Sequence, residues 1–160
     1  TTFVVEIPFE IAPPPEEFPV KEAAPSGDIH GLKLLLAEDN ELNAEIAETL
    51  LTDAGAHVTI VKNGKKAVDC FEAASPGTFD AILMDVMMPV MDGLAATRAI
   101  RAIPRADARQ IPILAMTANA FEEDARQCLA AGMNVHLAKP LQMDKVLAAL
   151  MECCGKKKDL

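Results

Sequence analysis

Residues 82–93, ILMDVMMPVMDG, run from an apolar segment straight into an aspartate and then into a methionine-rich stretch that ends in Asp-Gly. Residues 82–84 have the continuous apolar character of a strand that is buried on both faces of a sheet. Asp85 follows directly, and a carboxylate is costly to bury unless it is paired. The stretch therefore predicts that a central strand leaves the core at Asp85, where the carboxylate meets other polar groups.

From residue 32 onward, five strand-like runs alternate with five helix-like segments. The expected strands are residues 32–37, 57–61, 81–84, 111–116 and 135–138. The expected helices are residues 41–54, 65–74, 94–102, a fourth that ends at Gly132, and 143–153. Strict alternation predicts an α/β fold with a parallel sheet, because parallel neighbours need crossover connections that place helices on both faces.

Two of the expected helices carry additional sequence signals. The first has an apolar stripe at four-residue spacing, which is typical of an amphipathic helix: Leu42, Ile46, Leu50 and Ala54. Gly55 can take the left-handed position after that helix. In the fourth helix, Asn119 is the expected N-cap residue and Glu122 its capping-box partner.

Polar residues follow four of the five expected strands. They are Glu38, Asp39 and Asn40 after the first strand, Asp85 after the third, Thr117 after the fourth, and Lys139 and Pro140 after the fifth. The carboxyl ends of parallel strands share one edge of a sheet, so these residues are expected to converge. Two like charges at ~4 Å repel by about 4 kcal/mol at an effective dielectric constant near 20, so protons or a cation must accompany the carboxylates.

Oxygen ligands favour a hard divalent cation, and octahedral Mg²⁺ suits a site with one or two direct carboxylates. Thr117 and Lys139 then supply a hydroxyl group and a positive charge, which together suit an incoming phosphoryl group. Asp85 is central and can accept that group as an aspartyl phosphate. A helix-capping or turn role explains any one of these residues equally well, but it does not explain the whole set.

Residues 34–40 read LLLAEDN, residues 84–93 MDVMMPVMDG, residues 116–118 MTA and residues 138–140 AKP. In order and spacing these segments resemble the receiver domains of two-component response regulators. The resemblance covers residues 32–153. It implies a flavodoxin-like (βα)5 fold, which is a doubly wound parallel sheet with strand order 2-1-3-4-5.

The resemblance implies that Asp85 is phosphorylated from a phosphohistidine in a phosphorelay. It also implies that Asp39, Asp85 and the backbone carbonyl of Met87 hold Mg²⁺, with Glu38 helping directly or through water. A receiver of this family catalyses its own phosphorylation and dephosphorylation. The implied partners are the dimerisation domain of a histidine kinase, which carries the phosphohistidine, and a histidine phosphotransfer protein.

The same resemblance gives roles to the residues around the last strand. Thr117 and Lys139 would contact the phosphoryl oxygens, and a cis peptide bond would precede Pro140. The family usually has Tyr or Phe three residues before its lysine, a side chain that swings inward on activation. His136 stands there in this chain, and it either makes the same movement or is an ordinary half-exposed strand residue.

Met87 and Asn119 lie two positions after Asp85 and Thr117, where family side chains flank the phosphoryl group and tune its hydrolysis. The apolar Met87 offers nothing to orient an attacking water, so we expect onward transfer to set the lifetime of the phosphate. The methionines of this region are expected to fill the core and the loop, because the neighbouring ligands are hard oxygens: Met84, Met87, Met88 and Met91.

The chain is expected to have four parts. Residues 1–10 resemble the final strand of a histidine kinase ATP-binding domain, residues 11–30 form a Pro/Glu/Ala-rich linker, residues 31–155 form the receiver, and residues 156–160 form a polar tail. Asn40 and Asn43 resemble receivers that are fused to hybrid sensor kinases. The expected parent protein is therefore a hybrid histidine kinase whose catalytic domain is not in this sequence.

Composition excludes several classes of partner and site. The net charge is −9, and an acidic chain without a basic patch is not expected to bind nucleic acid. The longest apolar runs are strand-sized, so direct membrane contact is not expected, although a parent kinase could be anchored elsewhere. The four cysteines have no zinc-site spacing and are expected to be reduced thiols of a cytoplasmic protein: Cys70, Cys128, Cys153 and Cys154.

Two other functions compete with a phosphorylated receiver. A pseudo-receiver would be a docking module that is never phosphorylated, but the complete set of acids, Thr117 and Lys139 disfavours it. A flavodoxin-like cofactor binder would need a Ser/Thr/Gly-rich phosphate loop after the first strand. Glu38, Asp39 and Glu41 occupy that place and would repel phosphate in the absence of a metal.

Overall fold

A computed structural model of the chain describes residues 29–118 and 121–155. In this part of the chain, five parallel strands form one sheet in the order β2-β1-β3-β4-β5. The strands are β1 Lys33–Ala37, β2 His57–Val61, β3 Ala81–Asp85, β4 Ile113–Thr117 and β5 Val135–Ala138. The predicted flavodoxin-like (βα)5 fold and its strand order are confirmed. The predicted strand in residues 1–10, most of the linker and the tail lie outside the described residues.

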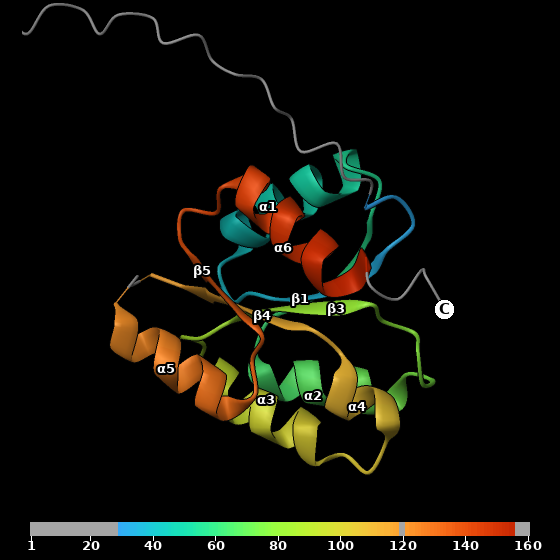
Figure 1. Cartoon of the computed structure of the whole chain (residues 1–160), viewed down its shortest axis with the longest axis vertical. Helices are drawn as coiled ribbons and strands as arrows, with labels where there is room; N and C mark the ends of the chain where they lie inside the picture. The colour runs from blue at the N-terminus through green and yellow to red at the C-terminus, as the bar shows by residue number, and fades with distance from the viewer. Residues whose placement is uncertain (1–28, 119–120, 156–160) are drawn as a thin grey trace, which may run out of the picture.

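Helices cover both faces of the sheet (Figure 1). They are α1 Glu41–Asp53, α2 Gly64–Ala73, α3 Gly93–Ala102, α4 Ala106–Gln110, α5 Glu122–Ala131 and α6 Met143–Cys154. α1 and α6 lie on one face, and α2, α3 and α5 lie on the other. Successive strand residues point to opposite faces, so Leu36 and Leu83 join the core under α1 and α6, whereas Leu35 and Ile82 join the other core.

Helix α1 buries a different face from the predicted apolar stripe. Its buried residues are Ala44, Ala47 and Leu51. Most of the predicted stripe is exposed: Leu42 by 64%, Ile46 by 51% and Leu50 by 39%. The two alanines let α1 approach the sheet closely, and the larger side chains lie away from this contact with the sheet. The end of the helix is as predicted, because Gly55 follows it with φ +93°.

The start of α5 differs from the prediction. The helix begins at Glu122, and its N-cap residue is Phe121, which makes no side-chain capping hydrogen bond. Glu122 is therefore the first helical residue and not the third, so the expected capping box is wrong. Asn119 itself lies outside the described residues. At the other end, Gly132 has a φ of 103° and caps the helix as predicted.

The short helix α4 was not predicted, and it moves the start of β4 from residue 111 to Ile113. The segment is held by Arg105, whose Nε and Nη2 atoms donate to the carboxylate of Asp107 at 3.0 and 2.8 Å. The guanidinium group also lies 4.7 Å from the centroid of the Phe71 ring. Five residues are too few to show a helical period, and the contacts that fix this helix come partly from distant segments.

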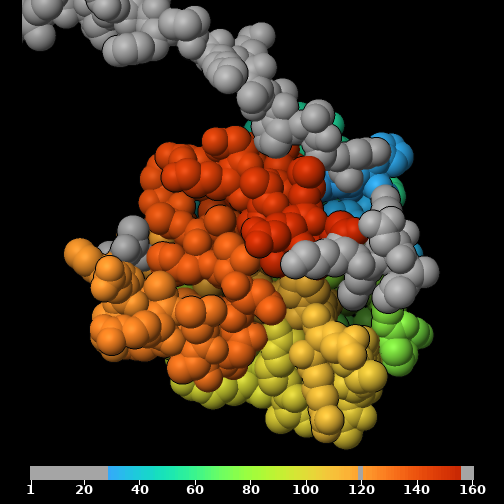
Figure 2. Space-filling model, viewed as in Figure 1, coloured from blue at the N-terminus to red at the C-terminus, as the bar shows by residue number. Residues whose placement is uncertain are grey.

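The outer surface is shown in the same orientation by Figure 2. On this face α5 and α6 form much of the surface, with α3 and α4 below them. Phe121 and Leu129 of this region are 70% and 58% exposed. Within residues 29–118 and 121–155, no helix has the length and apolar character that crossing a membrane requires.

Candidate phosphorylation site

The register of the sheet brings the predicted site residues to one edge. Asp85 is paired with Met116, the residue before Thr117. Thr117 is paired with Ala138, the residue before Lys139. Residues that are distant in sequence therefore meet where the central strands leave the core, as the alternation of strands and helices predicts.

Lys139 lies at the centre of this cluster. Its Nζ atom lies 2.7 Å from Oδ2 of Asp85 and 2.6 Å from Oε2 of Glu38. Glu38 and Asp85 are only 3% and 4% exposed. Burial alone would lower the pKa of Lys139, but hydrogen bonds and charges from Asp85 and Glu38 outweigh it, and the pKa is raised. Lys139 therefore stays protonated at neutral pH and holds two buried carboxylates together.

Glu38, Asp39 and Asp85 form a group that could hold a metal ion. One oxygen atom from each carboxylate lies within 4.8 Å of the others, and Asp39 is the exposed member. The donors are all oxygens and carry three negative charges, which suits a hard divalent ion such as Mg²⁺. Met87 donates its backbone N–H to Oδ1 of Asp85 at 3.1 Å, and a ligand role for its carbonyl stays a prediction.

The loop after Asp85 is packed tightly against the strand. Gly93 donates its N–H to the carbonyl of Val86 at 2.9 Å. A Cβ atom on Gly93 would lie 2.1 Å from the carbonyl oxygen of Asp85, so only glycine fits there. Val90 has a φ of 71°, a left-handed conformation that β-branched residues rarely adopt. Strained backbone of this kind is often found beside functional residues.

The methionines around Asp85 divide into core and surface positions. Met84 and Met88 are buried in the core, and Met91 packs against it. Met87 is 74% exposed. The burial of Met84 and Met88 and the packing of Met91 against the core agree with the expected packing role of these three methionines. The effect of Met87 on the lifetime of a phosphate stays a prediction.

The remaining predicted site residues that the structure describes lie in or beside β4 and β5. Thr117 is buried, with 5% exposure. His136 is half-buried on β5, where it is paired with Ala115. The Lys139–Pro140 peptide bond is cis, as the resemblance implied. Asn119 lies outside the described residues, so its role stays a prediction.

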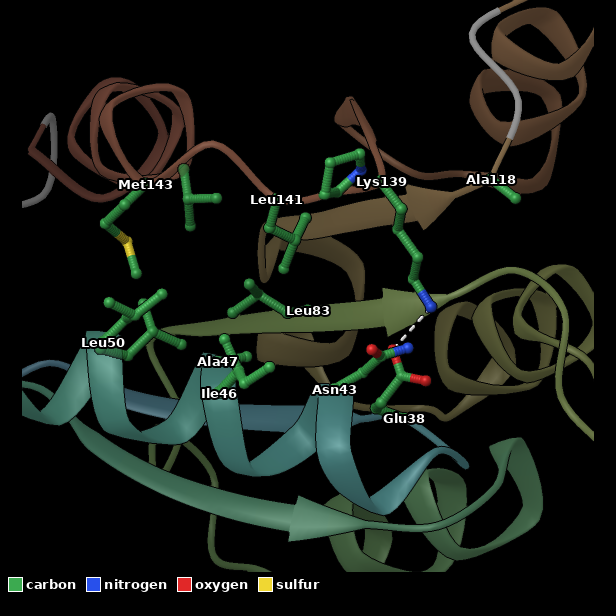
Figure 3. A pocket seen from close by; sticks show the side chains of 13 residues that line it. Glu38, Asn43, Ile46, Ala47, Leu50, Leu83, Ala118, Lys139, Leu141 and Met143 are labelled. Carbon is green, nitrogen blue, oxygen red and sulfur yellow. Dashed lines mark hydrogen bonds and ion pairs between the residues drawn. The ribbon is translucent and has the colours of Figure 1, made fainter.

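A cavity of about 400 Å³ adjoins the site between α1 and α6. Apolar side chains of α1 face those of the segment that enters α6 (Figure 3): Ile46 and Leu50 on one side, Leu141 and Met143 on the other. Glu38, Asn43 and Lys139 stand at one end of the cavity. The sequence does not indicate this cavity, because the apolar spacing of α1 is also typical of an ordinary amphipathic helix.

The family described as response regulator receiver domain matches residues 34–151. The chain belongs to this family. Among curated relatives, hybrid signal transduction histidine kinase I of Dictyostelium discoideum is 41% identical over 111 residues, which cover 68% of this chain and 6% of that protein. The sensor protein GacS of Pseudomonas syringae pv. syringae is 39% identical over 125 residues, which cover 77% of this chain and 13% of that protein. The receiver thus spans a small part of its relatives.

Solved receiver domains have the same fold. The receiver of sensor histidine kinase PA1611 from Pseudomonas aeruginosa PAO1, with magnesium coordinated in its active site cleft, is 43% identical, with a TM-score of 0.70 over 78% of this chain and 98% of that one. The receiver of Ssk1 from Saccharomyces cerevisiae, in complex with the histidine phosphotransfer protein Ypd1, is 26% identical, with a TM-score of 0.70 over 80% of this chain and 92% of the matched chain.

The structure of this receiver brings together most of the residues that the sequence singled out. Glu38, Asp39, Asp85 and Lys139 lie within one cluster, and Thr117 ends the adjacent strand. Sequence reasoning missed the close contact between Gly93 and the backbone of Asp85. Its only signal was a glycine at the start of a helix, and that position does not reveal a contact with the preceding strand.

Proposed function

We propose that this receiver accepts a phosphoryl group from a phosphohistidine onto Asp85 and passes it to a histidine phosphotransfer protein, as part of a cytoplasmic hybrid histidine kinase. The observation that carries the proposal is the simultaneous contact of Lys139 with Asp85 and Glu38 inside a cluster of three carboxylates. The excess of acids gives a place for a divalent cation, and Lys139 supplies a positive charge for the phosphoryl oxygens.

Mg²⁺ would be held by Glu38, Asp39 and Asp85, with the carbonyl of Met87 as a further ligand. When bound, it would neutralise charge on the phosphoryl oxygens. The proposal is supported by the all-oxygen character of the group and by the proximity of its oxygens, within 4.8 Å of one another. It is also supported by the related receiver of PA1611, which is described with magnesium in its active site cleft.

In the transfer step, one carboxylate oxygen of Asp85 forms a bond to phosphorus. The bond between phosphorus and the imidazole nitrogen breaks, and its electron pair stays on the ring. Lys139 begins hydrogen-bonded to Oδ2 of Asp85 and turns to a phosphoryl oxygen as the carboxylate loses its charge. Thr117, at the end of the neighbouring strand, donates its hydroxyl to another phosphoryl oxygen. The reverse sequence passes the group to the histidine of the next protein.

The partners follow from the same chemistry. The donor would be the dimerisation domain of a histidine kinase, and the acceptor a histidine phosphotransfer protein. The similarity to hybrid histidine kinases and to a receiver in complex with Ypd1 supports this assignment. The chain spans only 6% to 13% of the two relatives compared above, so the activity of the parent protein is part of the proposal.

The test is incubation with Mg²⁺ and acetyl phosphate, followed by intact mass spectrometry. We expect one phosphoryl adduct in the wild type, none in Asp85→Asn, and none when EDTA removes the metal. Asp69→Asn is the matched control, because Asp69 is an exposed acid whose partner is Lys65 on the surface of α2, and it should retain the adduct. A wild-type chain without an adduct would instead be a pseudo-receiver, and an adduct on Asp85→Asn would assign the acceptor elsewhere.

A further inference from the structure

The loop between β3 and α3 is fixed near both of its ends by backbone hydrogen bonds. At its first end, Val86 donates its N–H to the carbonyl of Met116 at 2.9 Å, and its carbonyl accepts from the N–H of Gly93, also at 2.9 Å. Near its second end, the carbonyl of Met91 accepts from the N–H of Gly64 at 3.0 Å. The loop is therefore held from β4 on one side and from the start of α2 on the other.

The contact at the start of α2 leaves room only for glycine. Gly64 is buried and is the first residue of α2, where a helix has N–H groups without an intrahelical partner. The N–H of Gly64 serves the loop instead, through its bond to Met91. A Cβ atom at Gly64 would lie 2.9 Å from the Cβ of Ala96 and from the carbonyl oxygen of Asp92, and closer still to the carbonyl oxygen of Met91. Because these distances are shorter than van der Waals contact, any side chain here would push the loop aside.

A displacement of Met91 has little room to pass into α3. Asp92 caps that helix by accepting the N–H of Ala95 at 2.7 Å. Gly93 lies so close to the carbonyl group of Asp85 that a Cβ atom there would overlap it. A shift of Met91 therefore passes backwards along the chain, into the middle of the loop.

The middle of the loop is its most exposed part. Met87 and Val90 are 74% and 85% exposed. Val90 has a φ of 71°, and Met91 donates its N–H to the carbonyl of Pro89 at 2.8 Å, a combination that forms a rare and strained kind of γ-turn. Strained backbone keeps its conformation only while the surrounding structure holds it. The position of Met87 therefore depends on the contact between Gly64 and Met91.

We propose that Gly64 is a positioning residue for metal binding: by holding Met91 without a side chain, it sets the position of the Met87 carbonyl relative to the carboxylate of Asp85. This inference rests on the proposed function, in which that carbonyl is a further ligand of Mg²⁺. Gly64 acts through the loop and not by contact with the ion. Displacing the loop therefore weakens Mg²⁺ binding, but it leaves the rate of phosphorylation at full metal occupancy unchanged.

The affinity for Mg²⁺ is measured directly, by following backbone amide signals in NMR spectra of the full chain during a Mg²⁺ titration without any phosphoryl donor. In Gly64→Ala we expect the Kd for Mg²⁺ to rise by about tenfold, the usual effect of disturbing a group that orients a metal ligand. Phosphorylation by acetyl phosphate should then need about tenfold more Mg²⁺ to reach half of its maximal rate, with the maximum within about twofold of the wild type. Gly155→Ala is the matched control, because a Cβ atom there meets nothing within 4 Å, and it should change neither quantity.

A loss of stability alone would not produce this result. Arg101→Ala removes hydrogen bonds to the carbonyls of Gly132 and Ala108, away from the loop, and should leave the Kd of the folded protein unchanged. If Gly64→Ala does not fold, Asn63→Ala takes its place. It keeps the glycine but removes the oxygen that accepts from the N–H of Lys66 at 2.8 Å and fixes the first turn of α2, and we expect the Kd to rise by about threefold.

The Kd for Mg²⁺ is the decisive quantity. An unchanged Kd in folded Gly64→Ala, or in Asn63→Ala where the first variant does not fold, would overturn the role of Gly64. A lower maximal rate with an unchanged Kd would overturn it as well. If the wild type binds no Mg²⁺ or forms no adduct, the proposed function itself has failed and this inference fails with it. That result differs from a wild type that binds Mg²⁺ and becomes phosphorylated but has the same Kd as Gly64→Ala, which overturns only the role of Gly64.

Discussion

Charged residues gather at both edges of the sheet, but the two edges are balanced differently. At the amino edge, where α3 and α5 end, Arg101 donates to the carbonyl of Gly132 at 3.0 and 2.9 Å, to the carbonyl of Ala108 at 2.8 Å and to Oδ1 of Asn134 at 3.0 Å. At the carboxyl edge, the one ammonium group of Lys139 serves both Glu38 and Asp85, with Asp39 nearby.

Arg105 follows the pattern of Arg101. It makes a two-point contact with Asp107 and donates to the carbonyl of Ala74 at 2.7 Å. Both arginines therefore have fixed acceptors supplied by the chain. At the carboxyl edge three carboxylates exceed the charge of one lysine. The first arrangement stabilises loops, whereas the second leaves a local negative charge that a metal ion and a phosphoryl group can use.

The largest expected effect is the loss of phosphorylation rate when the charge of Lys139 is removed. Lys139→Met keeps a long side chain but removes the charge that stabilises the phosphoryl oxygens. We expect phosphorylation by acetyl phosphate to be slower by about 100-fold or more, the typical cost of losing one such electrostatic contact. The measurement is the rate at which the phosphoryl adduct appears by intact mass.

Lys145→Met is the control for this change, because Lys145 is an exposed lysine on α6. Its rate should stay near that of the wild type. If Lys139→Met also reacted within about threefold of the wild type, the charge at the carboxyl edge would have a purely structural role, and the contrast between the two edges would disappear.

At the amino edge the corresponding change should affect stability and not chemistry. Arg101→Ala leaves the carbonyls of Gly132 and Ala108 without their donor, and we expect the free energy of unfolding to fall by about 3 kcal/mol. The measurement is urea denaturation, with phosphorylation of the folded variant close to the wild-type rate. Arg98→Ala, on an exposed position of α3, should cost little. A cost below about 1 kcal/mol for Arg101→Ala would show that these bonds hold nothing in place.

The carboxyl edge could be predicted from sequence, because strand alternation alone places the end of every strand at one edge. Asp85, Thr117 and Lys139 each follow an apolar run directly, so their convergence needs no knowledge of side-chain packing. The amino edge was not predicted. Arg101 and Arg105 lie on helix ends and loops, and their partners are mostly carbonyl groups, which every residue possesses and which leave no pattern in sequence.

The orientation of α1 on the sheet, and so the side of the helix that stays exposed, was not predicted for a related reason. A four-residue spacing identifies one side of a helix but does not say which side meets the sheet. Ala44, Ala47 and Leu51 form another stripe on the same helix, and close packing selected the stripe with small residues. The exposed Ile46 and Leu50 then line the cavity beside the site, a feature that requires the positions of two helices.

The smallest expected effect is a change in the free energy of unfolding that depends on pH, and it concerns Asp107 at the amino edge. The hydrogen bond from Arg105, with further help from the backbone N–H of Gly77, holds the pKa of Asp107 below its ordinary value of 3.8. A depressed pKa in the folded state adds stability that is present above the ordinary pKa and is lost as pH falls through the folded value. Asp107→Asn should therefore lower the free energy of unfolding by about 1 kcal/mol near neutral pH. In urea denaturations below pH 3.8 the loss should become progressively smaller.

At the carboxyl edge the dependence on pH has the opposite sign. Lys139 has a raised pKa, so its contribution to stability is lost only as pH rises through its pKa in the folded protein. A cost of Asp107→Asn that stays constant from neutral to acid pH would mean that the charge of Asp107 is not what holds α4, and Asp69→Asn provides the exposed comparison.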